Sequence, residues 1–499
     1  MNKTQLLRGI LFFCLCFCIN LITCVSNADN NEIPVTTNSA EARALYNEGM
    51  TLFDKGNFKQ AIEKFEHAVN KDPNFGTAYL YMGISFAYEG DEKKADELVN
   101  KAALATGLSK AEQLIIQWAK AGNDDDRNKQ KEITDELTAI HPNNATVQLL
   151  TGMYYSEINK HEKATEFYEK AVKQSPTFAN YDALACSYFS VENYNEALST
   201  YQKMVEMAPE NVSALRGTGL AYKQLGKLDE AIQNLDKALS INPYLSWVRS
   251  NLGDSYIVVD MPEKAKYHYQ KLLESATDNI ERRQAHYRLV GYYVVKNQLE
   301  EGYKELLKVS QMFEDAQEDQ HLWGNYHRRG DYCILWDEAT KAKQDYDIWI
   351  EMVDKSQEPD EYRNNQRANY YLNMVRLALM DNDVDKAKSI NQEFRQLKID
   401  NLKETKPYRK IQGLIAAAEG RYDEALAAFE KTTSPSSRNA TTTMRIARAY
   451  EGKGDIEKAR AHYQEILDSP GLGYYAFPYL LCRRQAKERL ASLSEMTTK

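Results

Sequence analysis

The sequence predicts an all-α protein in which about twelve helical hairpins follow one another along the chain, closed by a final helix. Three observations predict it: alanine recurs about every 34 residues, aromatic residues return at fixed places within that interval, and proline ends many of the units. In repeats of this length each unit packs on its neighbours and no central core forms. The 499 residues therefore need not divide into globular domains of ordinary size.

Composition narrows the class of protein. The chain is 43% hydrophobic and 11% aromatic, enough to bury a large apolar surface, so a disordered protein is excluded. The formal net charge is -9, charges of both signs alternate, and no run rich in Lys and Arg is present. Because neutralising phosphates requires a basic surface, nucleic acid is not expected as a partner.

Residues 1–28 are predicted to be a secretory signal peptide. Lys3 and Arg8 form a basic start, Ile10 to Ile19 is an unbroken apolar run, and small residues ending at Ala28 offer a cleavage site. Export to the periplasm or cell envelope is therefore expected. The apolar stretch falls short of the ~20 residues that span a bilayer, which disfavours a permanent membrane helix.

Lipidation is the alternative to cleavage after Ala28. Residues 21–24, Leu-Ile-Thr-Cys, resemble the lipoprotein box of bacteria, in which Cys24 would carry the lipid, although Thr23 stands where Gly, Ala or Ser is usual. Of the seven cysteines, only Cys186, Cys333 and Cys482 follow the signal segment. They are far apart on predicted helices, so we expect unpaired thiols there.

The first hairpin is predicted over residues 42–74, where an apolar helical period, a Gly-Asn break, a second helical period and an Asp-Pro pair follow in order. Residues 212–244 repeat this pattern in register. The matched positions are Gly49 with Gly219, Gly56 with Gly226, Ala61 with Ala231, Ala68 with Ala238, and Pro73 with Pro243.

An alanine early in each second helix marks the other units. It occurs at Ala61, Ala95, Ala164, Ala197, Ala231, Ala265, Ala342, Ala387, Ala425 and Ala459. Two of the intervals, 69 and 77 residues, are about twice the unit. They predict eroded repeats near residues 109–143 and 283–313, and hence about twelve repeats in all.

The recurring residue types have physical reasons. Two antiparallel helices approach closely only where side chains are small, so Gly or Ala marks the crossing and larger residues fill the rest of the seam. Proline ends second helices because it lacks the backbone donor and restricts the residue before it. The aromatic residues are Tyr155, Tyr188, Tyr222, Tyr256 and Tyr450 on first helices and Phe65, Tyr168, Tyr201, Tyr269, Phe429 and Tyr463 on second helices.

This pattern resembles the tetratricopeptide repeat family over nearly all of residues 41–470. The resemblance implies a right-handed α-solenoid whose concave face, lined by first helices, holds peptide segments of partner proteins. The sequence departs from the family in the two eroded units and in longer connections at 274–282, 314–320 and 354–366. We divide the chain into an N-terminal array (41–275), a degenerate repeat and connection (276–322), a C-terminal array (323–470), and a capping helix with a tail (471–499).

The last stretch, Tyr479 to Leu493, has an apolar face that suits a helix closing the end of the stack. Its basic residues Arg483, Arg484, Lys487 and Arg489 are expected on a solvated outer face. Contact with an acidic partner is the alternative.

No sequence feature indicates catalysis, a metal or a cofactor. The eight histidines are scattered, the glycines fit no phosphate-binding loop, and no nucleophile motif is present, so an enzyme is not expected. Asp124 to Asp126 resembles the start of a calcium loop, but Lys129 replaces the required glycine, and a helix start is favoured. Ser109 and Glu112 form the pattern of a capping box.

If the geometry of the family applies, the groove is apolar at its N-terminal end and mixed in the middle. The candidate groove residues are Tyr46, Met50, Phe53, Leu80, Ile84, Leu149, Met153, Arg216, Trp247 and Asn251. Some members of the family clamp a terminal carboxylate with Lys and Asn, but Leu220 replaces one of the asparagines here, so that function is not transferred.

The leading hypothesis is an exported, non-enzymatic scaffold that binds partner proteins or peptides in the concave groove. It would meet a membrane only through lipid on Cys24 or through a partner. One alternative is a sensor or periplasmic arm of a membrane-associated assembly. The other is an enzyme with a site in the degenerate repeats at 109–143 or 283–322.

Overall fold

The computed structural model describes residues 32–397, 399, 402–432, 439–468 and 477–497. The predicted signal peptide, its cleavage site after Ala28, and Cys24 lie outside these residues. The described part consists of α-helices and one short 3-10 helix, η1 (Leu402–Glu404), which confirms the all-α class. The chain forms two compact units, which we call unit 1 (residues 1–243) and unit 2 (residues 244–499).

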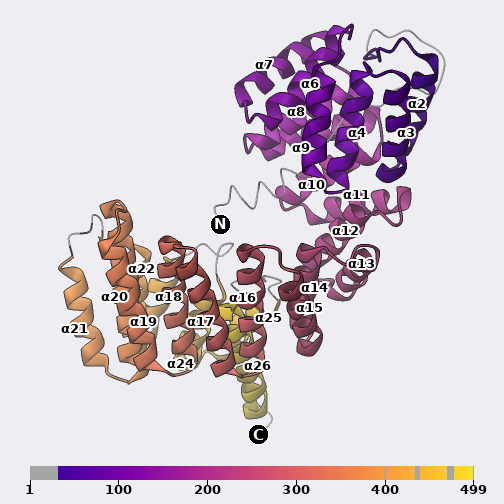
Figure 1. Cartoon of the computed structure of the whole chain (residues 1–499). Coiled ribbons are helices and arrows are strands. Elements are labelled where there is room, and N and C mark those ends of the chain that lie inside the picture. Colours follow the sequence, from indigo (N-terminus) through magenta and orange to yellow (C-terminus); the bar gives the residue numbers. More distant parts are fainter. Residues whose placement is uncertain (1–31, 398, 400–401, 433–438, 469–476, 498–499) are drawn as a thin grey trace. The chain divides into compact units, whose positions relative to one another are not determined.

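Six helical hairpins build unit 1, coloured indigo to magenta in Figure 1. In chain order they are α2 (Ala40–Phe53) with α3 (Phe58–Lys71), α4 (Gly76–Tyr88) with α5 (Glu92–Ala103), α6 (Lys110–Asn123) with α7 (Arg127–Ile140), α8 (Ala145–Glu157) with α9 (His161–Gln174), α10 (Phe178–Ser190) with α11 (Tyr194–Met207), and α12 (Val212–Gln224) with α13 (Leu228–Ile241).

Six more hairpins and a final helix build unit 2. They are α14 (Ser246–Val258) with α15 (Pro262–Ser275), α16 (Asn279–Val295) with α17 (Leu299–Asp315), α18 (Asp319–Leu335) with α19 (Ala339–Lys355), α20 (Asp360–Met380) with α21 (Val384–Arg395), α22 (Lys406–Ala418) with α23 (Tyr422–Glu430), α24 (Ala440–Lys453) with α25 (Ile456–Asp468), and α26 (Phe477–Thr497). The described residues thus confirm the predicted twelve hairpins.

Small residues allow the two helices of a hairpin to approach, as predicted. A Cβ added to Gly49 would lie 2.6 Å from the ring of Phe65, and the same holds for Gly152 with Tyr168, so these glycines leave room for the aromatic ring. The two eroded repeats are also hairpins. The position that holds alanine in the other repeats is occupied by Gln130, which is fully buried, in α7 and by Gly302 in α17. The recurring alanine therefore does not mark these two repeats.

First helices form the inner row of each unit. Contacts join α4 with α6, α8 with α10 and α10 with α12 in unit 1, and α14 with α16 and α20 with α22 in unit 2. The longer polar connection at 274–282 does not interrupt the stack, because α15 packs on α16 directly after it. The structure divides at residue 243 instead, at the end of the sixth hairpin.

Helix α26 packs on α24 and α25, as a capping helix should, and also contacts α16 and α18. Of its basic residues, Lys487 and Arg489 are exposed as expected, whereas Arg483 and Arg484 are half-buried, and all four contact neighbouring helices or loops. Arg484 donates from Nη1 to the Val294 carbonyl (3.1 Å) and to Asn297 Oδ1 (2.8 Å), and Lys487 pairs with Asp260 at 3.0 Å. Arg489 pairs with Glu451, and Arg483 donates to the Leu467 carbonyl.

Several local predictions are confirmed. Ser109 and Glu112 form a capping box at the start of α6, and Asp126 caps α7 by accepting from the Lys129 amide. Cys186, Cys333 and Cys482 are unpaired, the last two fully buried and Cys186 half-buried. Within the described residues, no helix combines the length and the apolar character that crossing a bilayer requires.

Candidate functional site

The seven apolar candidates of unit 1 are core residues, so the prediction that they line an exposed groove is wrong. Tyr46, Met50, Phe53, Leu80, Ile84, Leu149 and Met153 are all at most 7% exposed. The ring of Tyr46 lies 5.1 Å from that of Phe75 and 6.0 Å from that of Tyr81 between centroids, and Phe53 packs edge-on against Tyr81. These side chains hold neighbouring hairpins together.

The segment that precedes α2 contributes to this core. Ile33 is buried with the same cluster, and the Arg43 side chain holds the Val35 carbonyl at 2.5 Å. Glu112 accepts hydrogen bonds from the amide of Thr36 (2.7 Å) and the hydroxyl of Thr77 (2.7 Å). Burial raises the pKa of Glu112, but these bonds together hold that pKa below its usual value, so the carboxylate is an anchor for the segment.

The fifth hairpin returns onto the end of the first and closes unit 1. The Phe178 amide donates to the Asp54 carbonyl at 2.9 Å, and the buried Phe178 ring lies 5.7 Å from that of Phe58. Gly56 sits beside this ring with a φ of +76°, and an added Cβ would lie 2.6 Å from it. Asn211, at the start of the sixth hairpin, donates to the Gly56 carbonyl at 3.2 Å.

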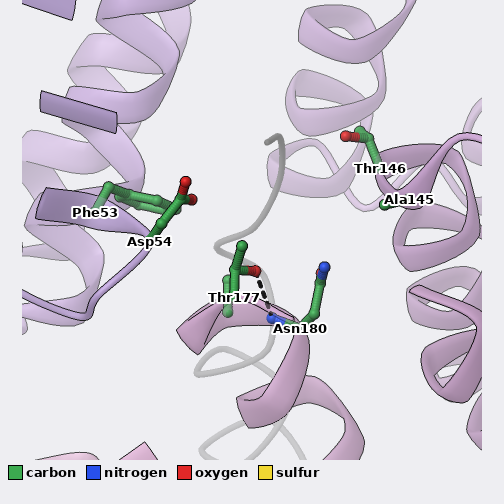
Figure 2. A pocket seen from close by; sticks show the side chains of 7 residues that line it. Phe53, Asp54, Ala145, Thr146, Thr177 and Asn180 are labelled. Carbon is green, nitrogen blue, oxygen red and sulfur yellow. Dashed lines mark hydrogen bonds between the residues drawn. The ribbon is translucent and has the colours of Figure 1, made fainter. Parts of the chain in front are cut away.

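A small cavity of about 10 Å³ lies between the end of α2 and the starts of α8 and α10, and Figure 2 shows the side chains around it. Phe53 and Asp54 line it from α2 and its end, Thr146 from α8, and Thr177 and Asn180 from the start of α10. That volume holds about one water molecule, so the cavity takes no peptide side chain. Burial raises the pKa of Asp54 to about 7.

The remaining three candidates are divided between the two units. Arg216 lies in unit 1 near Asp182, whose pKa is raised to about 6 by burial although Arg216 opposes the shift. Trp247 and Asn251 lie on α14 of unit 2, where Trp247 is 46% exposed and Asn251 donates back to the Trp247 carbonyl.

Unit 2 contains a larger cleft, of about 700 Å³. We call it the unit 2 cleft; its wall comes from the first helices α18, α20, α22 and α24 and from α26. Its apolar lining includes half-buried and buried side chains, namely Ile334, Leu335, Leu379, Met380, Leu414, Met444, Tyr479 and Leu481. Clefts of this size with an apolar wall and a few polar groups are typical of binding sites.

The polar groups of the unit 2 cleft are mostly cations. Arg376, Arg445 and Arg448 line it, together with Asp331 and Asp337. Asp331 is already engaged: Arg376 donates to it at 2.6 Å and the Tyr346 hydroxyl at 2.8 Å. Burial raises the pKa of Asp331, but Arg376 and then His327 outweigh it and hold that pKa at about 2, so the carboxylate is ionised.

Arg445 and the neighbouring Lys410 of α22 are different, because neither forms an ion pair or hydrogen bond with any residue that the structure describes. Burial, followed by the neighbouring Arg376, lowers the pKa of Arg445 to about 10. Burial, followed by Arg445, Lys406 and Arg376, lowers the pKa of Lys410 to about 8. Positive charge is therefore concentrated at this point of the cleft without an equal negative charge beside it.

These cations were not among the residues predicted from the sequence, although a signal for two of them was present. Arg376 and Arg445 each stand two residues before the small residue at a helix crossing, Ala378 and Ala447. Each of those alanines belongs to the same core cluster as the aromatic residue sixteen positions later, Phe394 and Tyr463. Aligning the repeats on the crossing would have shown the repeated arginine.

Comparisons with known proteins identify the type of repeat. Models of the tetratricopeptide repeat match residues 42–75, 145–178, 183–246 and 416–470, which fall on hairpins of both units. The chain carries tetratricopeptide repeats. Among the described residues, no group of three or more His, Cys, Asp or Glu side chains is placed to hold a metal ion.

The curated relatives that the chain matches are distant. The chain is 29% identical over 125 residues to sperm-associated antigen 1 of Mus musculus (24% of this chain, 14% of that protein) and 23% identical over 253 residues to Hsp70-Hsp90 organizing protein 3 of Arabidopsis thaliana (47% and 42%). A tetratricopeptide repeat protein of Methanocaldococcus jannaschii is 22% identical over 321 residues (59% and 49%). The chain thus spans less than half the length of each of these relatives.

Solved structures of tetratricopeptide repeat proteins also match. One, from Parabacteroides merdae, is 17% identical, with a TM-score of 0.39, over 55% of this chain and 98% of that one. Another, YrrB, described as having an unusual peptide-binding site, is 17% identical, with a TM-score of 0.27, over 44% and 95%.

Proposed function

We propose that this chain is an exported, non-enzymatic scaffold that binds segments of partner proteins in the unit 2 cleft. The observation that carries the proposal is the cleft itself: about 700 Å³ of open volume, on the inner row of first helices, with apolar walls and convergent charged groups. The name of one relative, Hsp70-Hsp90 organizing protein 3, supports a role in protein interaction. In unit 1, the cavity lined by Phe53, Asp54 and the start of α10 measures only about 10 Å³.

Partner capture with matched variants tests the scaffold function. The mature chain from Asp29 is immobilised beside a Leu335→Asp, Met380→Asp double variant, in which two half-buried side chains of the cleft wall become charged. Leu104→Asp serves as the control, because Leu104 is 80% exposed and is not among the residues that line the cleft. Proteins from cell envelopes that the parent and the control retain, and the double variant loses, are partners of the cleft.

The same proteins retained by all three forms would contradict binding in the unit 2 cleft. Circular dichroism of the double variant must match that of the parent, so that loss of binding is not loss of fold. Substituting Met50, Leu80 or Met153 would not serve, because their burial means that a charge there would unfold unit 1.

Export is a separate part of the proposal and rests on residues 1–28 of the sequence. The intact mass of the protein purified from cells tests it. A chain beginning at Asp29 indicates signal cleavage, a chain beginning at a lipid-modified Cys24 indicates a lipoprotein, and a chain that keeps residues 1–28 contradicts export.

A further inference from the structure

Charge is unevenly distributed around the unit 2 cleft. The whole chain carries a formal net charge of -9, yet the cleft is lined by Arg376, Arg445 and Arg448, with Lys410 beside them. Two aspartates line it as well. Asp331 is held by Arg376 and Tyr346, and Asp337 lies at the end of α18. Cations therefore exceed anions at a place where the protein as a whole has the opposite balance.

Arg445 and Lys410 have no described partner to compensate their burial. An unpaired charge removed from water costs free energy, and folds normally supply a counter-charge or expose the group. Here the nearby charges that act on both groups are mainly further cations. Both side chains are half-buried, so part of this cost is retained in the free protein, and an anion bound at this place would reduce it.

We propose that the unit 2 cleft binds an acidic peptide segment, with carboxylates of that segment paired to Arg445 and Lys410. The inference rests on the proposed scaffold function and adds the chemistry of the partner. Guanidinium and ammonium groups form charge-assisted hydrogen bonds with carboxylates, which are stronger than neutral ones.

The apolar wall explains why the partner is a peptide and not a small inorganic anion. The same cleft is lined by apolar side chains, which would remain exposed to water if only a free phosphate were bound. They are Leu335, Met380, Leu414, Met444 and Leu481. A segment that alternates acidic and apolar side chains covers both surfaces at once, as in the core of a protein interface. The volume of about 700 Å³ accommodates several side chains.

Selection from a random dodecapeptide library displayed on phage provides the probe. The full mature chain from Asp29 is the bait, and the selected peptides are synthesised with a fluorescent label for anisotropy titrations. We expect them to be enriched in Asp and Glu next to apolar residues. Replacing their Glu by Gln should weaken binding at least about tenfold, because a buried charge pair is lost.

Two variants identify the residues that receive the carboxylates. Arg445→Met and Lys410→Met keep the length of the side chain and remove the charge, and each should weaken binding of the acidic peptide at least about tenfold. Lys386→Met is the matched control, because Lys386 is an exposed residue of α21 with the same change of charge. The control should bind like the parent.

Thermal unfolding separates binding from a structural role. Since neither cation has a described partner, Arg445→Met and Lys410→Met should keep or raise the Tm of the free protein while they weaken binding. A lower Tm in both variants, with Glu-to-Gln peptides that bind unchanged, would mean that these cations support the fold and would overturn the proposal.

The remaining outcomes distinguish the inference from the proposed function. Peptides that lose binding with Leu335→Asp, Met380→Asp but not with the cation variants would keep the scaffold function and overturn the acidic partner. Peptides unaffected by every cleft variant, or none selected, would overturn both. Full competition by inorganic phosphate alone would indicate a small-anion site and also overturn the peptide.

Discussion

Units 1 and 2 are built from the same hairpin, yet their inner rows of first helices differ in what they leave open. In unit 1, the aromatic rings of the first helices share one buried core with Ile33 and Phe178, and the cavity at the start of α10 measures about 10 Å³. In unit 2, a cleft of about 700 Å³ stays open beside α26. The repeat therefore fixes the scaffold, and the side chains of the inner row decide whether it can bind.

The charges that the two units bury also differ. Unit 1 buries carboxylates: burial raises the pKa of Asp54 and Glu157 to about 7 and that of Asp182 to about 6. Unit 2 holds Asp331 in its ionised form and leaves Lys410 and Arg445 without a described partner. Three carboxyl groups of unit 1 therefore have raised pKa values, whereas the unit 2 cleft presents positive charge.

Phe178→Ala should have the largest effect on this comparison. Phe178 is fully buried where the fifth hairpin meets the first, and removing a buried phenylalanine side chain costs about 3–5 kcal/mol. We expect unit 1 to unfold at a lower urea concentration than unit 2. Tyr267→Ala is the control, because Tyr267 is 54% exposed and should change stability by less than about 0.5 kcal/mol. Equal effects would contradict the closure of unit 1.

Gly56→Ala should have the next largest effect. The Cβ would meet the Phe178 ring at 2.6 Å, and the positive φ of +76° adds strain, so we expect a loss of about 2–4 kcal/mol. Gly226→Ala is a matched control, with a φ of +74° but nothing within 4 Å of the added Cβ, and should cost about 1–2 kcal/mol. Urea unfolding of both variants measures the difference; no difference would show that Gly56 is not in a closing contact.

Asp54→Asn should produce a smaller, pH-dependent effect. The folded pKa of about 7 exceeds the ordinary value of 3.8, so the folded state binds the extra proton. Stability from this group is therefore full below about pH 4 and is lost as the pH rises through about 7. At pH 8 the variant should be about 1–2 kcal/mol more stable than the parent, and at pH 4 the gain should vanish. A gain that does not change with pH would contradict the burial of an ionisable carboxyl group.

The contacts of α26 should give the smallest effects. Arg484→Met removes the bonds to the Val294 carbonyl and Asn297, and we expect a loss of about 1–2 kcal/mol. Lys487→Met removes only an exposed pair with Asp260 and should cost less than about 0.5 kcal/mol. Thermal unfolding of the two variants compares them; a larger loss from Lys487→Met would mean that α26 is held differently.

Most of the fold could be predicted because its signals are local. The crossing of two helices requires a small residue near a large one, which made Ala61, Ala231 and Ala459 visible in the sequence. The two hairpins without that alanine were inferred only from the interval, since Gln130 and Gly302 fill the same place.

The site could not be predicted in the same way. Tyr46 stands on a first helix, where the repeat alone suggests an open groove, but it is buried against the rings of Phe75 and Tyr81. The cations of the unit 2 cleft come from three hairpins. Arg445 is notable only because the packed structure gives it no ion pair with a described residue. Long-range packing of this kind has no local sequence signal.

Photo-crosslinking tests most directly whether unit 2, and not unit 1, binds partners. A selected acidic peptide carrying benzoylphenylalanine is irradiated with the full mature chain, and the crosslinked residues are identified by mass spectrometry. Crosslinks to α18, α20, α22, α24 or α26 are the predicted result. Crosslinks concentrated on α2, α4 and α8 would contradict the closed inner row of unit 1 and, with it, the location of the site.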